Sequence, residues 1–256
     1  MIKKVIISLI FFLFLVVFFL NSDGLRYIGI NYKVSSQKVS NYQKIKDFYI
    51  RHQNYKKLVN KILLENKEPI SNVEKISFWI YKNIKKASDN DVIVDLHPWT
   101  IIERKIGAQD QFSDILSVLL VHNKIESFYT NLKINNNYPV TYFNHNSKWS
   151  IIDPYYGIYF KNNRNEFSSL EDLKNSNWKI FHLEYEIIDS KNCRIIFQNF
   201  KNSCIQEMNT FYLKLFLNIL SEKKINKTNI YYRGGRSYIQ KPFHRVIFQL
   251  KSLIKP

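Results

Sequence analysis

The chain has few residues that bend the backbone and few that are soft metal ligands. Its 256 residues include six glycines, six prolines, two cysteines and two methionines. Collagen-like, low-complexity and disulfide-dense classes are therefore excluded, because each needs much more glycine, proline or cysteine. The sequence also lacks a glycine-rich phosphate loop and the HExxH and CxxC motifs. We accordingly expect no cofactor and no bound metal.

The two cysteines, Cys193 and Cys204, do not have the spacing of metal ligands. Ten residues separate them. A disulfide is possible if the domain faces an oxidising compartment, and two buried free thiols fit the sequence equally well. The sequence leaves both alternatives open.

Acidic residues are also scarce, with 21 Asp and Glu against 38 Lys and Arg and a formal net charge of +17. Such a balance ordinarily points to an anionic partner. However, Lys, Asn, Ile, Phe and Tyr are all abundant together, as drift in an AT-rich coding sequence produces. The charge is therefore weak evidence, and we expect no nucleic-acid partner. With 45% hydrophobic and 16% aromatic residues, the chain can bury a sizeable core.

The N-terminus carries one long hydrophobic run. Lys3 and Lys4 precede Val5 to Leu20, sixteen residues without a charge or a helix breaker. This pattern predicts a transmembrane signal anchor over residues 1–22, uncleaved because no A-x-A pattern follows. The preceding lysines favour a cytoplasmic N-terminus. We expect a single-pass protein of the inner (plasma) membrane with its main body in the periplasm.

The next segment, residues 23–70, is expected to be a linker and a helical lead-in. Residues 21–40 are polar with scattered apolar residues and indicate a linker, and residues 41–66 have helical spacing. Ser71 to Glu74 then forms a capping box, which predicts the start of a helix that ends near residues 88–90.

A helix with a strong apolar stripe begins near Gln109. Its apolar residues recur at i, i+3, i+4, i+7 and i+8: Phe112, Ile115, Leu116, Leu119 and Leu120. Short strands are then predicted over residues 128–134, 140–143 and 149–152, followed by a short helix near residues 168–173. Helices followed by an antiparallel meander indicate an α+β fold.

These residues carry a resemblance to a known family. The local match consists of His97-Pro98-Trp99, Gly107 through Leu120, and Lys148-Trp149 through Asp153-Pro154 to Gly157. This arrangement resembles the bacterial transglutaminase-like superfamily. The resemblance implies a papain-type core in which N-terminal helices pack on an antiparallel sheet. It places the transglutaminase-like domain at residues 71–190.

The resemblance also implies where the catalytic residues should lie. The nucleophilic Cys position falls on Gln109, the His position on Tyr138 and the Asp position on Asp153. The first two are substituted. A carboxamide is not a nucleophile under these conditions, and a tyrosine with a pKa of about 10 is a poor general base near neutral pH. We therefore expect the family's acyl-transfer activity to be absent.

Two functions follow as hypotheses. The first is a membrane-anchored, catalytically inactive domain that acts as a binding or scaffold module at the cell envelope, with polysaccharide or peptide ligands. The second is an active amide hydrolase or acyltransferase of the same fold that uses unrecognised residues. Among the nearby histidines we retain only His97 as a candidate catalytic residue. His122 is expected at the end of the helix that begins near Gln109, and His145 is expected in a solvated turn.

Residues 191–256 are expected to form a helical, basic C-terminal extension. An apolar run over residues 208–220 is too short to span a bilayer and predicts a core or docking helix. Beyond it, basic residues outnumber acids, with only Glu222 acidic, and apolar residues interleave with them. This tail could contact anionic lipid or envelope polysaccharide, or form a solvated helix that covers the core.

Overall fold

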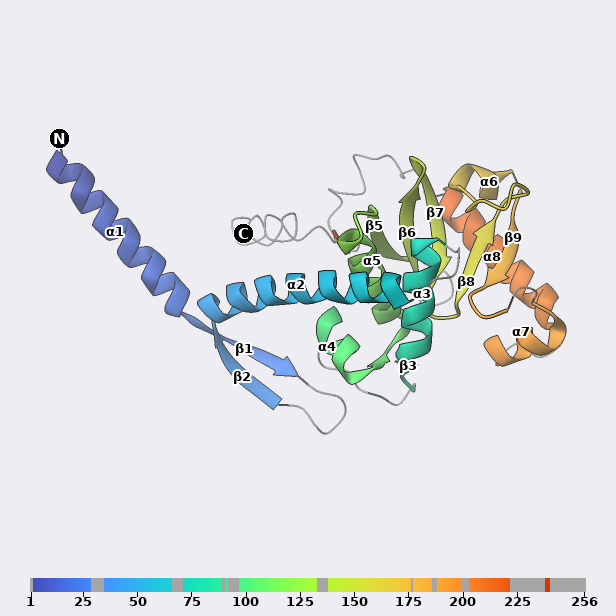
Figure 1. The fold of residues 1–256 in the computed structure, drawn as a ribbon, viewed down its shortest axis with the longest axis horizontal. Helices are drawn as coiled ribbons and strands as arrows, with labels where there is room; N and C mark the ends of the chain where they lie inside the picture. The colour runs from blue at the N-terminus through green and yellow to red at the C-terminus, as the bar shows by residue number, and fades with distance from the viewer. Residues whose placement is uncertain are drawn as a thin grey trace.

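A computed structural model gives the fold (Figure 1) and describes residues 2–28, 35–65, 71–88, 91, 97–132, 138–175, 177–185, 188–198, 203–221 and 238–239. The described helices are α1 (Ile2–Asn21), α2 (Asn41–Glu65), α3 (Asn72–Asn83), α4 (Pro98–Arg104), α5 (Gln109–His122), α6 (Leu170–Lys174), α7 (Ser190–Ile196) and α8 (Cys204–Ser221). The described strands are β1 (Asp23–Ile28), β2 (Ser35–Ser40), β3 (Lys85–Lys86), β4 (Ile106–Gly107), β5 (Ser127–Leu132), β6 (Tyr138–His145), β7 (Lys148–Asp153), β8 (Ile158–Lys161), β9 (Lys179–His182) and β10 (Tyr238–Ile239).

The centre of the fold is an antiparallel sheet with the strand order β10-β5-β6-β7-β8-β9. Neighbouring strands of its central part follow one another along the chain, so β5, β6, β7 and β8 form the meander that the sequence predicts. The α+β class is therefore confirmed. The register pairs Thr141 with Ile152, and it fixes which side chains lie on each face of the sheet.

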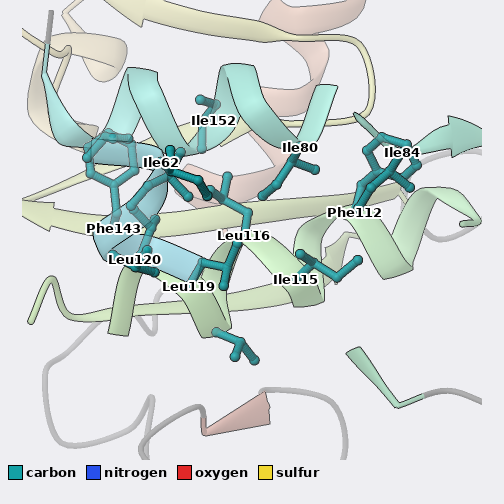
Figure 2. Close-up of a cluster of buried hydrophobic side chains, with 14 of the residues drawn as sticks. Ile62, Ile80, Ile84, Phe112, Ile115, Leu116, Leu119, Leu120, Phe143 and Ile152 are labelled. Atoms are coloured by element: carbon teal, nitrogen blue, oxygen red, sulfur yellow. The ribbon is translucent and has the colours of Figure 1, made fainter. Parts of the chain in front are cut away.

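One face of the sheet is covered by the helices that precede it. α5 packs on β5 and β6, and α2, α3 and α4 pack around α5. The apolar stripe of α5 is fully buried, together with Ile80 and Ile152 (Figure 2). Because α5 is buried on most sides, most of its side chains are apolar. It is the central helix of the hydrophobic core on this face of the sheet.

The other face of the sheet is covered by the C-terminal helices. Val140, Tyr142 and Ile151 point to this side and pack with residues of α7 and α8, including Tyr212 and Phe216. Both faces of the sheet are therefore buried. The domain boundaries expected at residues 71–190 and 191–256 stay predictions, but α7 and α8 complete a core that begins in the sheet.

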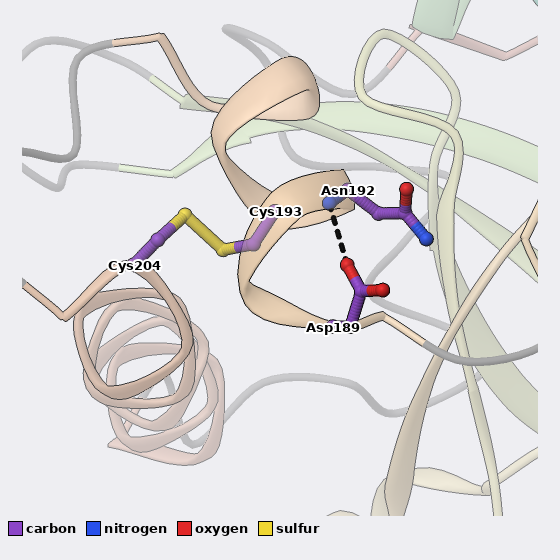
Figure 3. Close-up of a disulfide and its surroundings, with 4 residues drawn as sticks. All are labelled: Asp189, Asn192, Cys193 and Cys204. Carbon is purple, nitrogen blue, oxygen red and sulfur yellow. Dashed lines mark hydrogen bonds between the residues drawn. A yellow bond between two sulfur atoms is a disulfide. The ribbon is translucent and has the colours of Figure 1, made fainter.

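Cys193 and Cys204 form a disulfide, which resolves the alternative left open by the sequence (Figure 3). It joins the middle of α7 to the first residue of α8. The start of α7 is capped by Asp189, whose Oδ1 accepts from the backbone N–H of Asn192 at 2.7 Å. The bridge therefore holds α8, which covers the second face, to a short capped helix.

Replacing both cysteines by serine is expected to lower the free energy of unfolding by about 3 kcal/mol, because the short closed loop would regain entropy in the unfolded chain. Denaturant unfolding of the full chain in mild detergent measures this loss. Arg194→Ala, on the exposed side of α7, is the matched control and should cost less than about 0.5 kcal/mol. Equal midpoints for the double variant and the control would show that the bridge does not stabilise the fold.

Two parts of the N-terminal half differ from the expected secondary structure. The segment expected to be a linker contains regular structure, because residues 23–28 and 35–40 pair as β1 and β2, with Asp23 opposite Ser40. Its role as a linker stays a prediction. Polar side chains do not prevent this pairing, since backbone groups make it. The helix that starts at Ser71 ends at Asn83 rather than near residues 88–90, because Lys85 and Lys86 form β3. Its capping box is confirmed.

α1 covers the hydrophobic run predicted as an anchor. Its large apolar side chains from Ile6 to Phe19 are exposed. Within the part of the chain that the structure describes, no helix is long and apolar enough to cross a membrane. The transmembrane helix predicted for residues 1–22 is therefore not found.

Candidate functional site

Asp153 lies at the end of β7 and is 1% exposed. Its Oδ1 accepts from the backbone N–H groups of Tyr155 and Tyr156, each at 3.2 Å. The Asp-Pro sequence ends the strand and turns the chain, so these two N–H groups come to face the carboxylate. Asp153 thus organises its own turn.

The other carboxylate oxygen is bound by two tyrosines. Oδ2 of Asp153 accepts from the hydroxyl of Tyr138, the first residue of β6, and from the hydroxyl of Tyr212 on α8 at 3.1 Å. Tyr212 is fully buried, and Tyr138 is partly buried with its ring packed against Phe211. The Asp153 carboxylate thus accepts four hydrogen bonds, one from the sheet, two from the turn and one from α8. We call Asp153, Tyr138 and Tyr212 with the two turn N–H groups the Asp153 cluster.

Burial and the Asp153 charge determine the protonation of the cluster. Burial raises the pKa of Tyr138 well above its usual value of 10, and the neighbouring Asp153 charge raises it further. The pKa of Tyr212 is also raised well above 10, by burial and by the Asp153 charge. Burial also raises the pKa of Asp153, opposed by the hydrogen bonds that it accepts. Tyr138 therefore holds its proton and cannot serve as a base.

Gln109 is the first residue of α5, as the sequence predicts. Its Nε2 is buried and has no hydrogen-bond partner among the described residues. Phe112, one turn further along α5, packs edge-on against Tyr155 with ring centroids 5.2 Å apart. The turn after Asp153 therefore reaches the first turn of α5.

The three residues predicted at catalytic positions are brought together only in part. Tyr138 and Asp153 are hydrogen-bonded and share the sheet face that α8 covers, whereas α5 packs on the opposite face. The link between α5 and the turn after Asp153 that the structure gives is the contact of Phe112 with Tyr155. α5 is also held on β6, because Thr141 Oγ1 donates to the carbonyl of Ser113 at 3.2 Å, one turn into the helix.

Lys86 is a residue of this region that sequence reasoning missed. β3 pairs with β4 in parallel, so that Lys86 lies opposite Gly107, two residues before Gln109. Its Nζ lies 4.6 Å from the centre of the Tyr155 ring and 4.8 Å from that of Tyr156. Although much of the residue is exposed, burial of the ammonium lowers its pKa, and the Asp153 charge opposes that shift. A pairing of two residues leaves no periodic signal in the sequence.

His182 was also missed. It is 3% exposed, and its Nδ1 accepts from the backbone N–H of Glu184 at 3.0 Å. The neutral ring therefore carries its proton on Nε2. Burial lowers the pKa of His182 to about 4. Gly157, at φ +70°, covers Nε2, and a Cβ there would lie 3.0 Å from it. His182 is thus a neutral packing residue.

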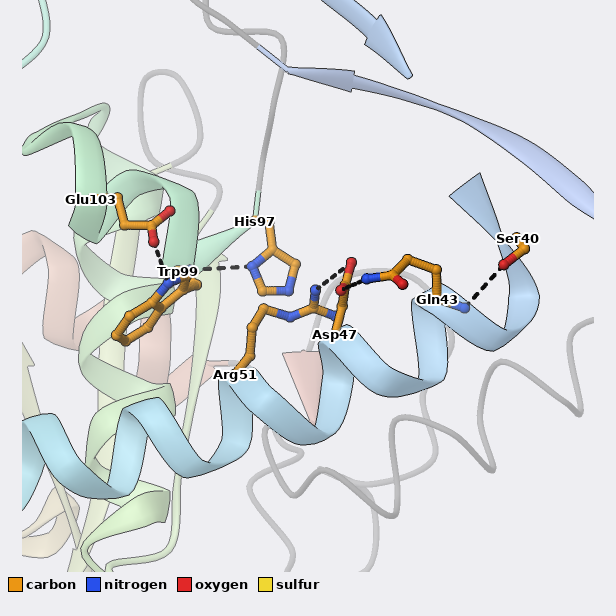
Figure 4. Close-up of polar contacts among 7 residues, drawn as sticks. All are labelled: Ser40, Gln43, Asp47, Arg51, His97, Trp99 and Glu103. Carbon is orange, nitrogen blue, oxygen red and sulfur yellow. Dashed lines mark hydrogen bonds and ion pairs between the residues drawn. The ribbon is translucent and has the colours of Figure 1, made fainter. Parts of the chain in front are cut away.

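His97 acts as the N-cap of α4 (Figure 4). Its Nδ1 accepts from the backbone N–H of Trp99 at 3.2 Å, while the Trp99 indole donates to Glu103. His145 lies at the end of β6 and packs edge-on against Phe167. These contacts give both rings a structural role.

His122 lies at the end of α5 but does not have the simple surface role expected for it. Its Nδ1 is 2.7 Å from the carbonyl of Val118, and its Nε2 is 2.9 Å from Nδ1 of His52 on α2. Because a carbonyl only accepts, His122 carries its proton on Nδ1 and accepts from His52. Burial lowers the pKa of His122 to about 4. The pair ties α2 to α5 while both rings are neutral.

No group of three or more His, Cys, Asp or Glu side chains within the described ranges could hold a metal ion.

Comparison with known proteins gives a limited result. No family model and no curated protein matches the chain. Among solved structures, one that matches is described as "a Putative Cysteine Protease from Cytophaga hutchinsonii". The match covers 63% of this chain and 74% of that chain, with 15% sequence identity and a TM-score of 0.36. These values describe a low similarity between the two folds.

Proposed function

We propose that this chain is a transglutaminase-like domain that binds a ligand or a partner and does not catalyse acyl transfer. The observation that carries the proposal is the Asp153 cluster. In a working triad the carboxylate orients an imidazole, which takes the proton of the nucleophile. Here the carboxylate accepts from Tyr138 and Tyr212 instead. The orienting group is used to hold β6 and α8 together.

The residue at the nucleophile position supports the same proposal. The carboxamide of Gln109 has no readily ionised proton, so the dipole of α5 cannot activate it as it would a thiol. Loss of one member of such a triad typically costs about 10⁴ to 10⁶ in kcat. With two positions changed, turnover near the uncatalysed rate is expected.

The same proposal places the domain at a membrane and outside the cytoplasm. The exposed apolar side chains of α1 support association with a lipid bilayer, because water does not favour such a surface. The disulfide between Cys193 and Cys204 supports an oxidising compartment. Polysaccharide or peptide of the cell envelope is the proposed ligand class. The basic tail of residues 222–256, for which we expected membrane or glycan contact, lies outside the described residues apart from β10.

Activity measurements on the full chain in mild detergent test the proposal. With a glutamine-containing peptide and an amine donor, we expect no ammonia release above a no-protein control. We also expect no labelling by an iodoacetamide probe under non-reducing conditions. Turnover that survives replacement of both cysteines by serine but is lost in Gln109→Ala would overturn the proposal.

An active enzyme of the same fold remains a second candidate, and Lys86 is the observation that favours it. Its Nζ lies over the rings of Tyr155 and Tyr156, and burial lowers the pKa of this amine, which suits a nucleophile or a base. If Lys86 acts in this way, turnover in the same assay would be lost in Lys86→Met and kept in the neighbouring exposed variant Lys85→Met. Absence of turnover in the wild-type chain would dismiss this candidate.

A further inference from the structure

The first half of α2 has an exposed apolar face. Tyr42, Ile45 and Tyr49 are 58%, 55% and 64% exposed, and Ile50 beside them is 43% exposed. The spacing i, i+3 and i+7 places these residues in one stripe along the helix. This length of apolar surface is unusual for a helix in contact with water alone.

The opposite side of α2 is already occupied. Near the start of the helix, Gln43 bonds to Ser40 and Asp47, and Asp47 pairs with Arg51 (Figure 4). Further along, the residues that pack on the domain are buried: Tyr55, Val59 and Ile62. The apolar stripe therefore points away from both the polar network and the domain core.

Lysines continue the same stripe toward the end of α2. Lys56 and Lys57 follow Tyr49 by two helical turns and are exposed, and Lys46 is exposed within the apolar part. The face thus combines apolar side chains with three ammonium groups. We call these residues the outer face of α2: Tyr42, Ile45, Lys46, Tyr49, Ile50, Lys56 and Lys57.

The start of α2 is fixed to the end of α1 by hydrogen bonds. Asn41 Nδ2 donates to the carbonyl of Phe19 at 2.9 Å and to the hydroxyl of Ser22 at 2.7 Å. The backbone N–H of Asn41 also donates to the carbonyl of Ser22 at 3.0 Å. The apolar end of the outer face therefore begins where the exposed apolar helix α1 ends (Figure 1).

We propose that the outer face of α2 lies on the surface of a bilayer that contains anionic lipids. The inference rests on the proposed association of α1 with the membrane. With α1 in lipid, the Asn41 junction keeps the first turns of α2 at the interface, where tyrosine side chains are favoured. Lys46, Lys56 and Lys57 then face lipid phosphates. A second copy of the chain is a poorer occupant, because it would bring like charges together.

Single-cysteine labelling tests the inference, because the native cysteines are bridged and an added thiol is the labelling site. The full chain is reconstituted in vesicles of phosphatidylglycerol and phosphatidylcholine without reductant. An environment-sensitive fluorophore is attached at Tyr49→Cys on the outer face, at Arg51→Cys on the inner side, or at Phe12→Cys on α1. Quenching by nitroxide carried on the lipid headgroups and upper acyl chains reports contact with the bilayer.

We expect strong quenching at positions 12 and 49 and weak quenching at position 51. Replacing Lys46, Lys56 and Lys57 by Glu should reduce the bilayer-bound fraction at position 49 at least about tenfold, because each basic residue contributes near an anionic surface. Quenching at position 12 without quenching at position 49 would overturn the inference and leave the α1 proposal intact. Absence of quenching at positions 12 and 49 would overturn both the inference and the α1 proposal. Energy transfer between probes at position 49 without lipid quenching would overturn the inference and identify a second copy of the chain as the occupant.

Discussion

Replacing Asp153 by alanine is expected to lower the free energy of unfolding by about 4 kcal/mol. The substitution removes the acceptor for two buried tyrosine hydroxyls and two backbone N–H groups. Buried donors left without an acceptor typically cost about 1–3 kcal/mol each, and breaking a buried charged network costs about 3–5 kcal/mol in total. Denaturant unfolding of the full chain in mild detergent measures the loss.

Two milder variants make this prediction testable even if Asp153→Ala fails to fold. Tyr138→Phe and Tyr212→Phe each remove one donor while keeping the ring and should each cost about 2 kcal/mol. Their effects should be non-additive, because they share the Oδ2 atom of Asp153. If all three variants unfold within about 0.5 kcal/mol of the wild type, Asp153 does not hold the sheet and α8 together.

Acidification is expected to destabilise the fold between about pH 6.5 and about pH 4. Burial lowers the pKa values of His122 and His182 to about 4 from 6.5. As the pH falls, these histidines therefore bind protons in the unfolded chain before they do so in the folded chain. The contribution of each neutral histidine to the free energy of unfolding is complete above pH 6.5 and is lost as the pH falls toward 4. A shift of this size corresponds to at most about 3 kcal/mol for each residue.

His122→Gln isolates one of these contributions. Glutamine can still donate to the Val118 carbonyl and accept from His52, but it does not titrate. We expect the loss of stability on acidification to be smaller in the variant than in the wild type by up to about 3 kcal/mol. Asn60→Gln, an exposed change on α2 that neither adds nor removes a titratable group, serves as the control and should leave the pH dependence unchanged. Parallel pH profiles for His122→Gln and the wild type would contradict the assignment.

The sequence predicted those parts of the fold that depend on a regular pattern. The apolar stripe of α5 predicted this helix, and short runs of β-branched and aromatic residues between polar turns predicted β6 and β7. The capping box at Ser71 likewise predicted the start of α3. In each case neighbouring residues in the chain carry the information.

Parts that depend on contacts between distant residues could not be read in this way. The β1–β2 hairpin is held by backbone groups, so the polar sequence of residues 21–40 resembled a linker. Lys86 reaches the region of Gln109 through a pairing of only two residues. Tyr212 donates to Asp153 across 59 positions of the chain, and its helix looked in sequence like a separate extension. Of the candidate site, the position of Gln109 at a helix start was thus predictable, whereas the partners of Asp153 were not.

We propose that Gln109, Tyr138 and Asp153 occupy the three catalytic positions of a transglutaminase-like site, with the first two substituted and the Asp retained. The most direct test of this claim is the thiol pKa of a Gln109→Cys, Tyr138→His double variant, measured by the pH dependence of iodoacetamide alkylation, with Gln109→Cys alone as the matched control. The native cysteines are bridged and do not react. If the three positions converge, the introduced imidazole can bond to Asp153 and face the new thiol. The pKa of that thiol should then fall from about 8.5 to about 7 or lower, below that of the single variant. Equal and ordinary thiol pKa values in the two variants would contradict the claim.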